Sequence, residues 1–217
     1  MNEKRKKLIY IIITVMLATF VGIGVYYWYK NSYYVSTEDA KVMGDLVSVS
    51  PQISGKLLEV DVEEGDAVIE GQILGRQGVS NPQETNIDQS VFRAPISGIV
   101  IKKQGTVGEI ISPGQTIAMI IDPNKLYITA NIEETKLAKV KQGQKVDITI
   151  DQFGNKTFSG RVKYVGQASN STFALLPTST SGTFTKVIQK IPVKIEFDKS
   201  DNTLLPGTNA IVNVHIK

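Results

Sequence analysis

The sequence predicts a mainly β protein with one membrane-spanning helix at its N-terminus. Three observations lead there: an uncharged run of 22 residues near the start, an internal repeat at an offset of 43 residues, and apolar–polar alternation in the C-terminal part. Eighteen Gly and eight Pro indicate many turns between short strands. With no Cys and a single His, the composition excludes disulfide scaffolds, thiol catalysis and metal sites built from Cys or His clusters.

The uncharged run, Leu8–Tyr29, is the expected transmembrane helix. At about 1.5 Å per residue it can cross a hydrocarbon core of about 30 Å. Four basic residues precede it and only Lys30 follows closely, so the positive-inside bias keeps residues 1–7 in the cytoplasm. A cleaved signal peptide is the alternative, but no small-residue cleavage site follows the run. We therefore expect a single-pass protein of the cytoplasmic (inner) membrane with its bulk outside the cytoplasm.

The net charge of +3 resides at the N-terminus rather than in the body. Residues 1–30 hold five basic residues and one acidic residue, which leaves a net charge of −1 for the other 187. The body therefore lacks the cationic face that binds phosphate backbones, and nucleic acid is not expected as a partner.

The middle of the chain contains two copies of one structural unit. Ile53–Gly55 aligns with Ile96–Gly98, and further glycines align without a gap at the same offset. Glycine adopts positive φ without a Cβ penalty, which suits turns. Neither copy could bury a core alone, so the two are expected to pack face to face as a small sandwich. The glycines predicted as structural turns are Gly55, Gly65, Gly71, Gly98, Gly108 and Gly114.

Paired half-motifs of this kind resemble the biotinyl/lipoyl-like barrel-sandwich hybrid of acyl-carrier domains and of membrane fusion proteins, the adaptor subunits of efflux pumps and secretion systems. A carrier domain needs a modifiable Lys in the hairpin between its halves, and Gly75–Phe92 contains none. The adaptor interpretation gains from segments outside the repeat. Thr37–Val42 and Val49–Gly55 resemble the family's TDDAYV…VSPQVSG opening, and Arg93–Gly98 resembles its RAPxDGxV element.

Two later segments narrow the resemblance to the EmrA-like branch of the HlyD family. Asn131–Leu137 resembles the ANFKETQL element, and Ser171–Pro177 with Gly182–Val193 is similar to FSLLP…GNFTKVVQRVPV. The resemblance covers roughly residues 35–217. It implies a multidrug or small-molecule efflux adaptor that forms homo-oligomers and binds an inner-membrane transporter, of the major facilitator type rather than an ATP-driven one.

The chain departs from most adaptors between the two halves, where they insert a long α-helical coiled-coil hairpin. Here Gly75–Ser90 is short and polar, with Pro82 and without an apolar heptad, so no coiled coil is expected. We expect a lipoyl-like domain over 46–122, with halves at 46–76 and 92–121 and a solvated loop at 77–91. The chain therefore lacks the coiled-coil hairpin with which such adaptors reach an outer-membrane channel.

From Leu126 onward, longer alternating strands predict a small β-barrel over 123–217, joined by a strand from the connector at 30–45. A short amphipathic helix is expected at Glu133–Val140. The expected strands are Thr37–Asp45, Lys145–Asp151, Thr157–Val165, Val187–Phe197 and Ala210–Ile216.

A Ser/Thr-rich loop at 167–185 interrupts this pattern and contains apolar side chains without strand periodicity. They either fold back on the core or form a contact surface for a partner. The candidate partner contacts are Phe173, Leu175, Leu176 and Phe184.

No catalytic, cofactor-binding or metal-binding residues are identified. P-loop, dinucleotide, HExxH and Gly-x-Ser-x-Gly motifs are absent from the sequence. The adjacent acid pairs Glu63-Glu64 and Glu133-Glu134 do not converge, because strand neighbours point to opposite faces and helix neighbours lie about 100° apart. The leading hypothesis is a non-enzymatic adaptor. The alternatives are a surface-tethered structural or carrier-like module and a surface hydrolase, which would have to use His215.

Overall fold

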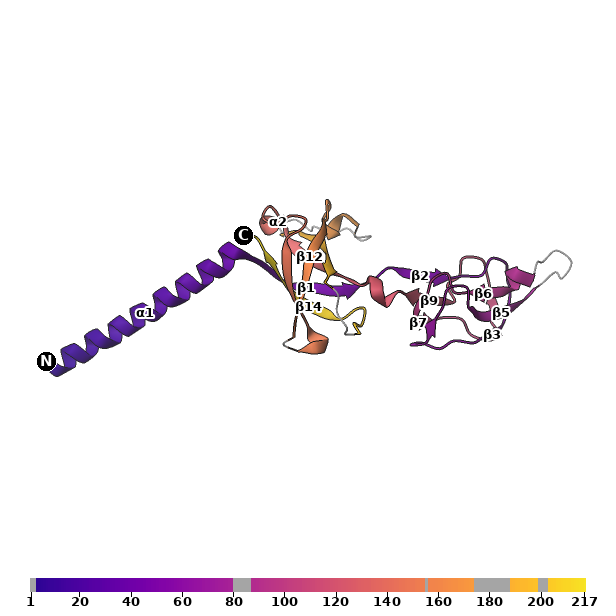
Figure 1. Cartoon of the computed structure of the whole chain (residues 1–217), viewed down its shortest axis with the longest axis horizontal. Coiled ribbons are helices and arrows are strands. Elements are labelled where there is room, and N and C mark those ends of the chain that lie inside the picture. The colour runs from indigo at the N-terminus through magenta and orange to yellow at the C-terminus, as the bar shows by residue number, and fades with distance from the viewer. Residues whose placement is uncertain (1–2, 80–86, 155, 174–187, 199–202) are drawn as a thin grey trace, which may run out of the picture. The chain divides into compact units, whose positions relative to one another are not determined.

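The computed structural model describes residues 3–79, 87–154, 156–173, 188–198 and 203–217 (Figure 1). The apolar run lies within helix α1 (Glu3–Tyr33), of which Ile11–Tyr33 is long and apolar enough to cross a membrane. The next residue, Tyr34, begins strand β1, and Figure 1 shows the helix running into the strand without a loop.

Contacts divide the chain into two units. The barrel unit comprises Met1–Lys41, Ile128–Ser200 and Thr208–Lys217, and the sandwich unit comprises Val42–Tyr127 and Asp201–Gly207. The sandwich unit is thus inserted into the barrel unit, since the barrel draws strands from both ends of the chain.

Six strands form a closed barrel, in which β1 pairs with both β10 and β14. Alternate side chains of each strand are buried, as in β10, where Ile128, Ala130 and Ile132 face inward. Closure leaves no unpaired strand edge. In barrel order the strands are β1 (Tyr34–Met43), β10 (Tyr127–Glu133), β13 (Lys190–Phe197), β12 (Thr157–Val165), β11 (Lys145–Ile150) and β14 (Asn209–His215).

Helix α2 (Glu134–Leu137) is shorter than the predicted Glu133–Val140. The backbone N–H groups of Lys139 and Val140 donate to carbonyls three residues earlier, so the segment tightens into turns after one helical turn. The short 3-10 helices are η1 (Ile87–Ser90), η2 (Pro123–Lys125), η3 (Asp151–Phe153) and η4 (Asn170–Phe173).

The sandwich unit has two four-stranded sheets, and each sheet takes two strands from each repeat copy. One sheet has the order β2 (Leu46–Val49), β9 (Ala118–Ile121), β7 (Gly98–Lys103), β4 (Ala67–Val68). The other has the order β6 (Val91–Arg93), β5 (Ile73–Val79), β3 (Gly55–Val60), β8 (Ile110–Ile111). The two copies form one sandwich, as expected, but neither sheet is built from a single copy. Each copy completes the other's sheets, and Leu57 and Val100, which are equivalent in the repeat, share one core.

The repeat glycines fall into two classes. Gly65, Gly71, Gly108 and Gly114 have φ between +82° and +98° in turns. Gly55 and Gly98, also predicted as turns, instead begin strands β3 and β7. A Cβ on Gly55 would lie 2.0 Å from the Gly78 carbonyl oxygen, and one on Gly98 would lie 2.2 Å from that of Ile121. These two positions require glycine because another backbone passes close by.

Candidate functional site

Three of the segments that carry the family resemblance meet on the barrel wall. Thr37–Val42 lies in β1, Asn131–Leu137 spans the end of β10 and α2, and Lys190 begins β13. Since β10 pairs with β1 on one side and β13 on the other, these segments are neighbours although the sequence separates them by up to about 150 residues.

A β-bulge in β1 determines which side chains face outward. Thr37 is opposite Val212 and Ala40 is opposite Ala210, so Glu38 and Asp39 together oppose one residue of β14. Val35 and Ala40 are both buried, which strict alternation would not allow. The extra residue shifts the alternation and puts Asp39 on the outer face, as bulges commonly re-aim a side chain.

Asp39 is the centre of a group of polar side chains, the Asp39 cluster, formed by Asp39, Asn131, Asn170 and Lys190. Lys190 Nζ donates to Asp39 Oδ2 at 2.7 Å, and Asn131 Nδ2 donates to Asp39 Oδ1 at 3.0 Å. Asn170 Nδ2 in turn donates to Asn131 Oδ1 at 2.9 Å. The hydrogen bonds from Lys190 and Asn131 lower the pKa of Asp39 below its usual value.

The Asp39 cluster positions neighbouring elements and adds little to the stability of the barrel. The Asp39 and Lys190 side chains are 39% and 47% exposed, and ion pairs at such positions are worth about 0–1 kcal/mol. What the cluster does is join β1, β10, β13 and η4 on one outer surface.

Hydrogen bonds hold both described borders of the 174–187 segment against the barrel. On one border, Asn170 of η4 bonds to Asn131, and Ser171 Oγ donates to Gln189 Oε1 at 2.6 Å. On the other border, the Gln189 carbonyl accepts from the Glu134 N–H at 2.9 Å. The described residues on both borders, Asn170 and Ser171 on one and Gln189 on the other, therefore lie beside the Asp39 cluster.

Three of the four predicted partner contacts lie in this segment, and the fourth, Phe173, directly precedes it. Phe173 is the last residue of η4, and its side chain is outside the described part of the chain. Leu175, Leu176 and Phe184 also lie outside the described residues. Sequence reasoning singled out these apolar residues and missed the Asp39 cluster. The signal for the cluster was the five-residue step between the apolar Val35 and Ala40, which breaks the alternation of a plain strand.

A polar hollow of about 970 Å³ lies over the outer face of β1. Its basic and acidic side chains are nearly balanced, which favours contact with a mixed-charge protein surface over binding of one ion. The charged lining residues are Lys30, Lys136 and Lys190 with Glu38, Asp39, Glu133 and Asp151.

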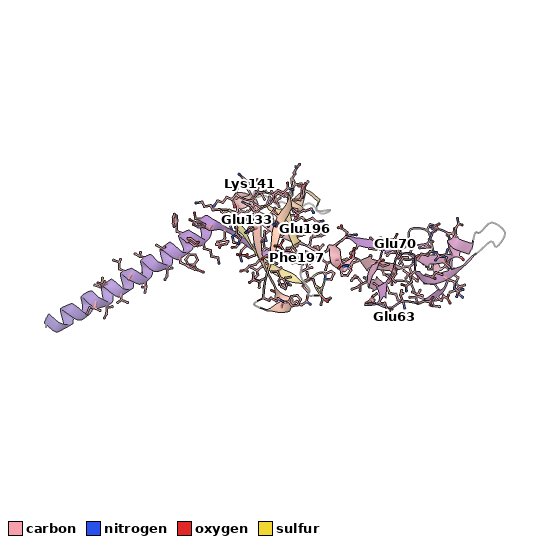
Figure 2. The ribbon with its side chains drawn as sticks, in the orientation of Figure 1. Glu63, Glu70, Glu133, Lys141, Glu196 and Phe197 are labelled. Atoms are coloured by element: carbon pink, nitrogen blue, oxygen red, sulfur yellow. The ribbon has the colours of Figure 1, made fainter. Side chains whose placement is uncertain are left out.

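The acid pairs make local contacts and do not converge on one cavity. Lys103 bonds to both members of the first pair, through its Nζ to Glu63 and through its backbone N–H to Glu64. In the barrel unit, Lys136 Nζ lies 2.9 Å from Glu133. Figure 2 shows Glu63 on the sandwich unit and Glu133 on the barrel unit. Among the described residues no group of three His, Cys, Asp or Glu side chains is placed to hold a metal ion.

His215 has a structural environment in the barrel wall. Its Nε2 lies 2.7 Å from Asp147 Oδ2, and its ring packs edge-on against Tyr34 with a centroid separation of 4.8 Å. No serine completes a triad among the partners described for this His. The geometry of the Asp39 cluster and of the polar hollow supports binding between surfaces.

Comparisons with known proteins agree with the two units. Residues 45–123 match the barrel-sandwich hybrid domain of RND membrane fusion proteins, and residues 126–214 match the YknX-like beta-barrel domain. YhbJ of Bacillus subtilis (strain 168), named for a component of an efflux system, is 37% identical over 186 residues, which cover 85% of this chain and 81% of YhbJ. The chain belongs to the membrane fusion protein family.

EmrA proteins are among the other relatives of this membrane fusion protein. The colistin resistance protein EmrA of Acinetobacter baumannii is 33% identical over 140 residues, which cover 63% of this chain but only 40% of EmrA. The solved structure of the periplasmic adaptor protein EmrA matches with a TM-score of 0.57 at 16% identity and covers 84% of this chain and 98% of that one, which shows a shared fold. The predicted family and the predicted mainly β fold, with an apolar N-terminal helix, a barrel-sandwich hybrid and a β-barrel, are thus confirmed.

Proposed function

We propose that this membrane fusion protein is the membrane-anchored adaptor subunit of a multidrug or small-molecule efflux system and binds an inner-membrane transporter. The observation that carries the proposal is the relationship to YhbJ, which extends over both units and is not confined to one domain. The EmrA-like relatives have export and resistance names, which supports efflux as the process.

The architecture supports a role beside a membrane partner. Helix α1 passes directly into β1, so the barrel is held close to the end of the membrane span. Such tethering raises the local concentration of the barrel at any transporter in the same membrane. We propose that the surface around the Asp39 cluster, together with the segment that begins at Phe173, contacts that transporter. The EmrA-like resemblance favours a major facilitator transporter over an ATP-driven one.

The proposed topology places residues 1–7 in the cytoplasm and residues 31–217 outside it. Protease added to intact, wall-stripped cells should digest the two units, whereas full protection would overturn this orientation. We also propose that the adaptor works as a homo-oligomer. The short polar connection at 77–91 argues for a system that does not reach an outer-membrane channel through a coiled-coil hairpin.

A gene deletion and a cross-linking experiment test the adaptor role. Deleting the adaptor should sensitise cells to exported compounds as strongly as deleting the transporter does. A surface-tethered structural module predicts unchanged susceptibility instead.

The contact is tested with a photo-reactive residue introduced at Phe173 or, as a matched apolar control, at Ile69, which is 72% exposed on the sandwich unit. Cross-links to the transporter should form from position 173 and not from position 69. Polar replacements at Phe173 and Leu176 should weaken those cross-links without unfolding the barrel. Loss of folding would show that these side chains pack in the core, and undiminished cross-linking would place the contact elsewhere.

A further inference from the structure

A small pocket at the junction of the membrane helix and the barrel differs in charge from the hollow over β1. It has a volume of about 230 Å³ and is lined by Tyr27, Lys30 and Asn31 of α1, by Tyr34 of β1, and by Lys136 and Lys139 around α2. We call it the basic pocket. Three lysines line it, and no carboxylate does so among the described residues.

Two of these lysines have no acidic partner in the described part of the chain. Lys136 is paired with Glu133, but Lys30 and Lys139 make no ion pair with any described residue. Unpaired ammonium groups brought together repel one another, so an anion between them is favoured. Asn31 and the two tyrosines add uncharged hydrogen-bond donors around the same space.

The depth of the basic pocket follows from the helix. The uncharged run ends at Tyr29, so Lys30 and Asn31 lie at the boundary between hydrocarbon and headgroups. Tyr26–Tyr29 are aromatic, as is typical of residues at this level.

The barrel is fixed at that depth because there is no loop between α1 and β1 and because the C-terminus binds the same junction. The Ile216 N–H donates to the Tyr33 carbonyl at 3.0 Å, and Lys217 Nζ lies 5.2 Å from the centre of the Tyr33 ring. Lys136 and Lys139 therefore reach the level of the headgroups with the barrel.

We infer that the basic pocket binds the phosphate headgroup of an anionic phospholipid in the leaflet next to the barrel. Lys30 and Lys139 are the main charge partners, and the tyrosines pack beside the glycerol and upper acyl-chain region. This inference requires α1 to span the membrane but is independent of the transporter and of which side faces out.

The single tryptophan provides the assay, because Trp28 lies beside Tyr27 on the same helix. The full chain is reconstituted into phosphatidylcholine vesicles containing a brominated lipid, either phosphatidylglycerol or phosphatidylcholine, and quenching of Trp28 is measured. One lysine near an anionic surface changes binding about five-fold. Brominated phosphatidylglycerol should therefore bind next to Trp28 at least about five-fold more strongly than brominated phosphatidylcholine.

Variants separate the pocket from a simple attraction to the helix end. Lys139→Gln should lower the preference for phosphatidylglycerol about five-fold, and Lys139→Arg should retain it. Lys102→Gln, which removes an exposed lysine of the sandwich unit, is the matched control and should leave the preference unchanged. An effect of Lys30→Gln with none of Lys139→Gln would overturn the pocket, since Lys30 alone would then suffice.

Two further results would count against a lipid. Equal quenching by the two brominated lipids in the wild-type protein would show that no anionic headgroup is selected. Loss of the preference on adding inorganic phosphate, but not sodium chloride of the same ionic strength, would show that the pocket takes soluble phosphate. Retention of the preference in phosphate, with loss in Lys139→Gln and an unchanged melting temperature of that variant, would support the inference.

Discussion

Replacing Gly98 by Ala should destabilise the sandwich unit strongly through steric overlap alone. Gly98 begins β7 and is not one of the glycines with positive φ. Its backbone conformation therefore accepts alanine. The new Cβ, however, would lie 2.2 Å from the Ile121 carbonyl oxygen and 2.8 Å from its carbonyl carbon. A carbon–oxygen contact needs about 3.3 Å, so β7 and β9 would have to separate by about 1 Å.

The expected cost is about 3 kcal/mol, at the upper end of the range for overpacking, because the obstacle is backbone and not a flexible side chain. For a unit of this size that corresponds to a fall in melting temperature of about 12–24 °C. Gly78→Ala is the matched control, since its Cβ would meet nothing closer than 3.7 Å and the residue lies in strand β5 of the same unit. That variant should be neutral or slightly stabilised.

Calorimetry of the full chain, combined with hydrogen exchange of the β7 and β9 peptides, is the appropriate assay. Intrinsic tryptophan fluorescence does not report on this unit because Trp28 lies in α1. Gly98→Ala should lower the transition in which β7 and β9 lose protection. If Gly98→Ala melts at the same temperature as Gly78→Ala, β7 and β9 do not approach each other as described and the reasoning fails.

Three further predictions concern turns and titrating groups. Gly65→Val or Gly108→Val should cost about 1–3 kcal/mol, because both positions have positive φ, and unchanged calorimetric melting in both variants would contradict that assignment. Asp39→Asn should lower barrel stability by less than about 1 kcal/mol at neutral pH. The hydrogen bond from Lys190 lowers the folded-state pKa of Asp39, so the stability that Asp39 contributes is present above pH 3.8 and is lost as pH falls through the folded-state pKa. A stability difference between wild type and Asp39→Asn that does not shrink in acid would refute the assignment. Burial, followed by the hydrogen bond to Asp45, raises the pKa of Tyr127 above 10.0, so its contribution is present below that pH and is lost as pH rises through the folded-state pKa. Tyr127→Phe should therefore remove part of the alkaline destabilisation of the sandwich unit in melting experiments, and an identical alkaline profile would count against it.

Local patterns in the sequence were enough to predict most of the helices, turns and strands of the fold. The uncharged run, the glycine repeat and the alternation of buried residues each depend on neighbours within a few positions, and α1, the turns at Gly65 and Gly108 and the barrel strands follow from them. The family resemblance rested on short segments read in order along the chain, and the comparisons confirm it.

Only the tertiary structure decided which of these segments meet. The two repeat copies exchange strands because each sheet needs partners that its own copy lacks, and no local pattern records that choice. The glycines at 55 and 98 are required by a backbone that arrives from elsewhere in the chain. Asp39 faces Lys190 because a bulge turns Asp39 outward and because only β10 lies between β1 and β13 in the barrel. In the sequence, 151 positions separate the two residues. The basic pocket likewise depends on a helix end and on α2, about 100 residues later, reaching one place. Periodicity fixes which face of a strand is buried, whereas contacts over such distances depend on how the strands pair.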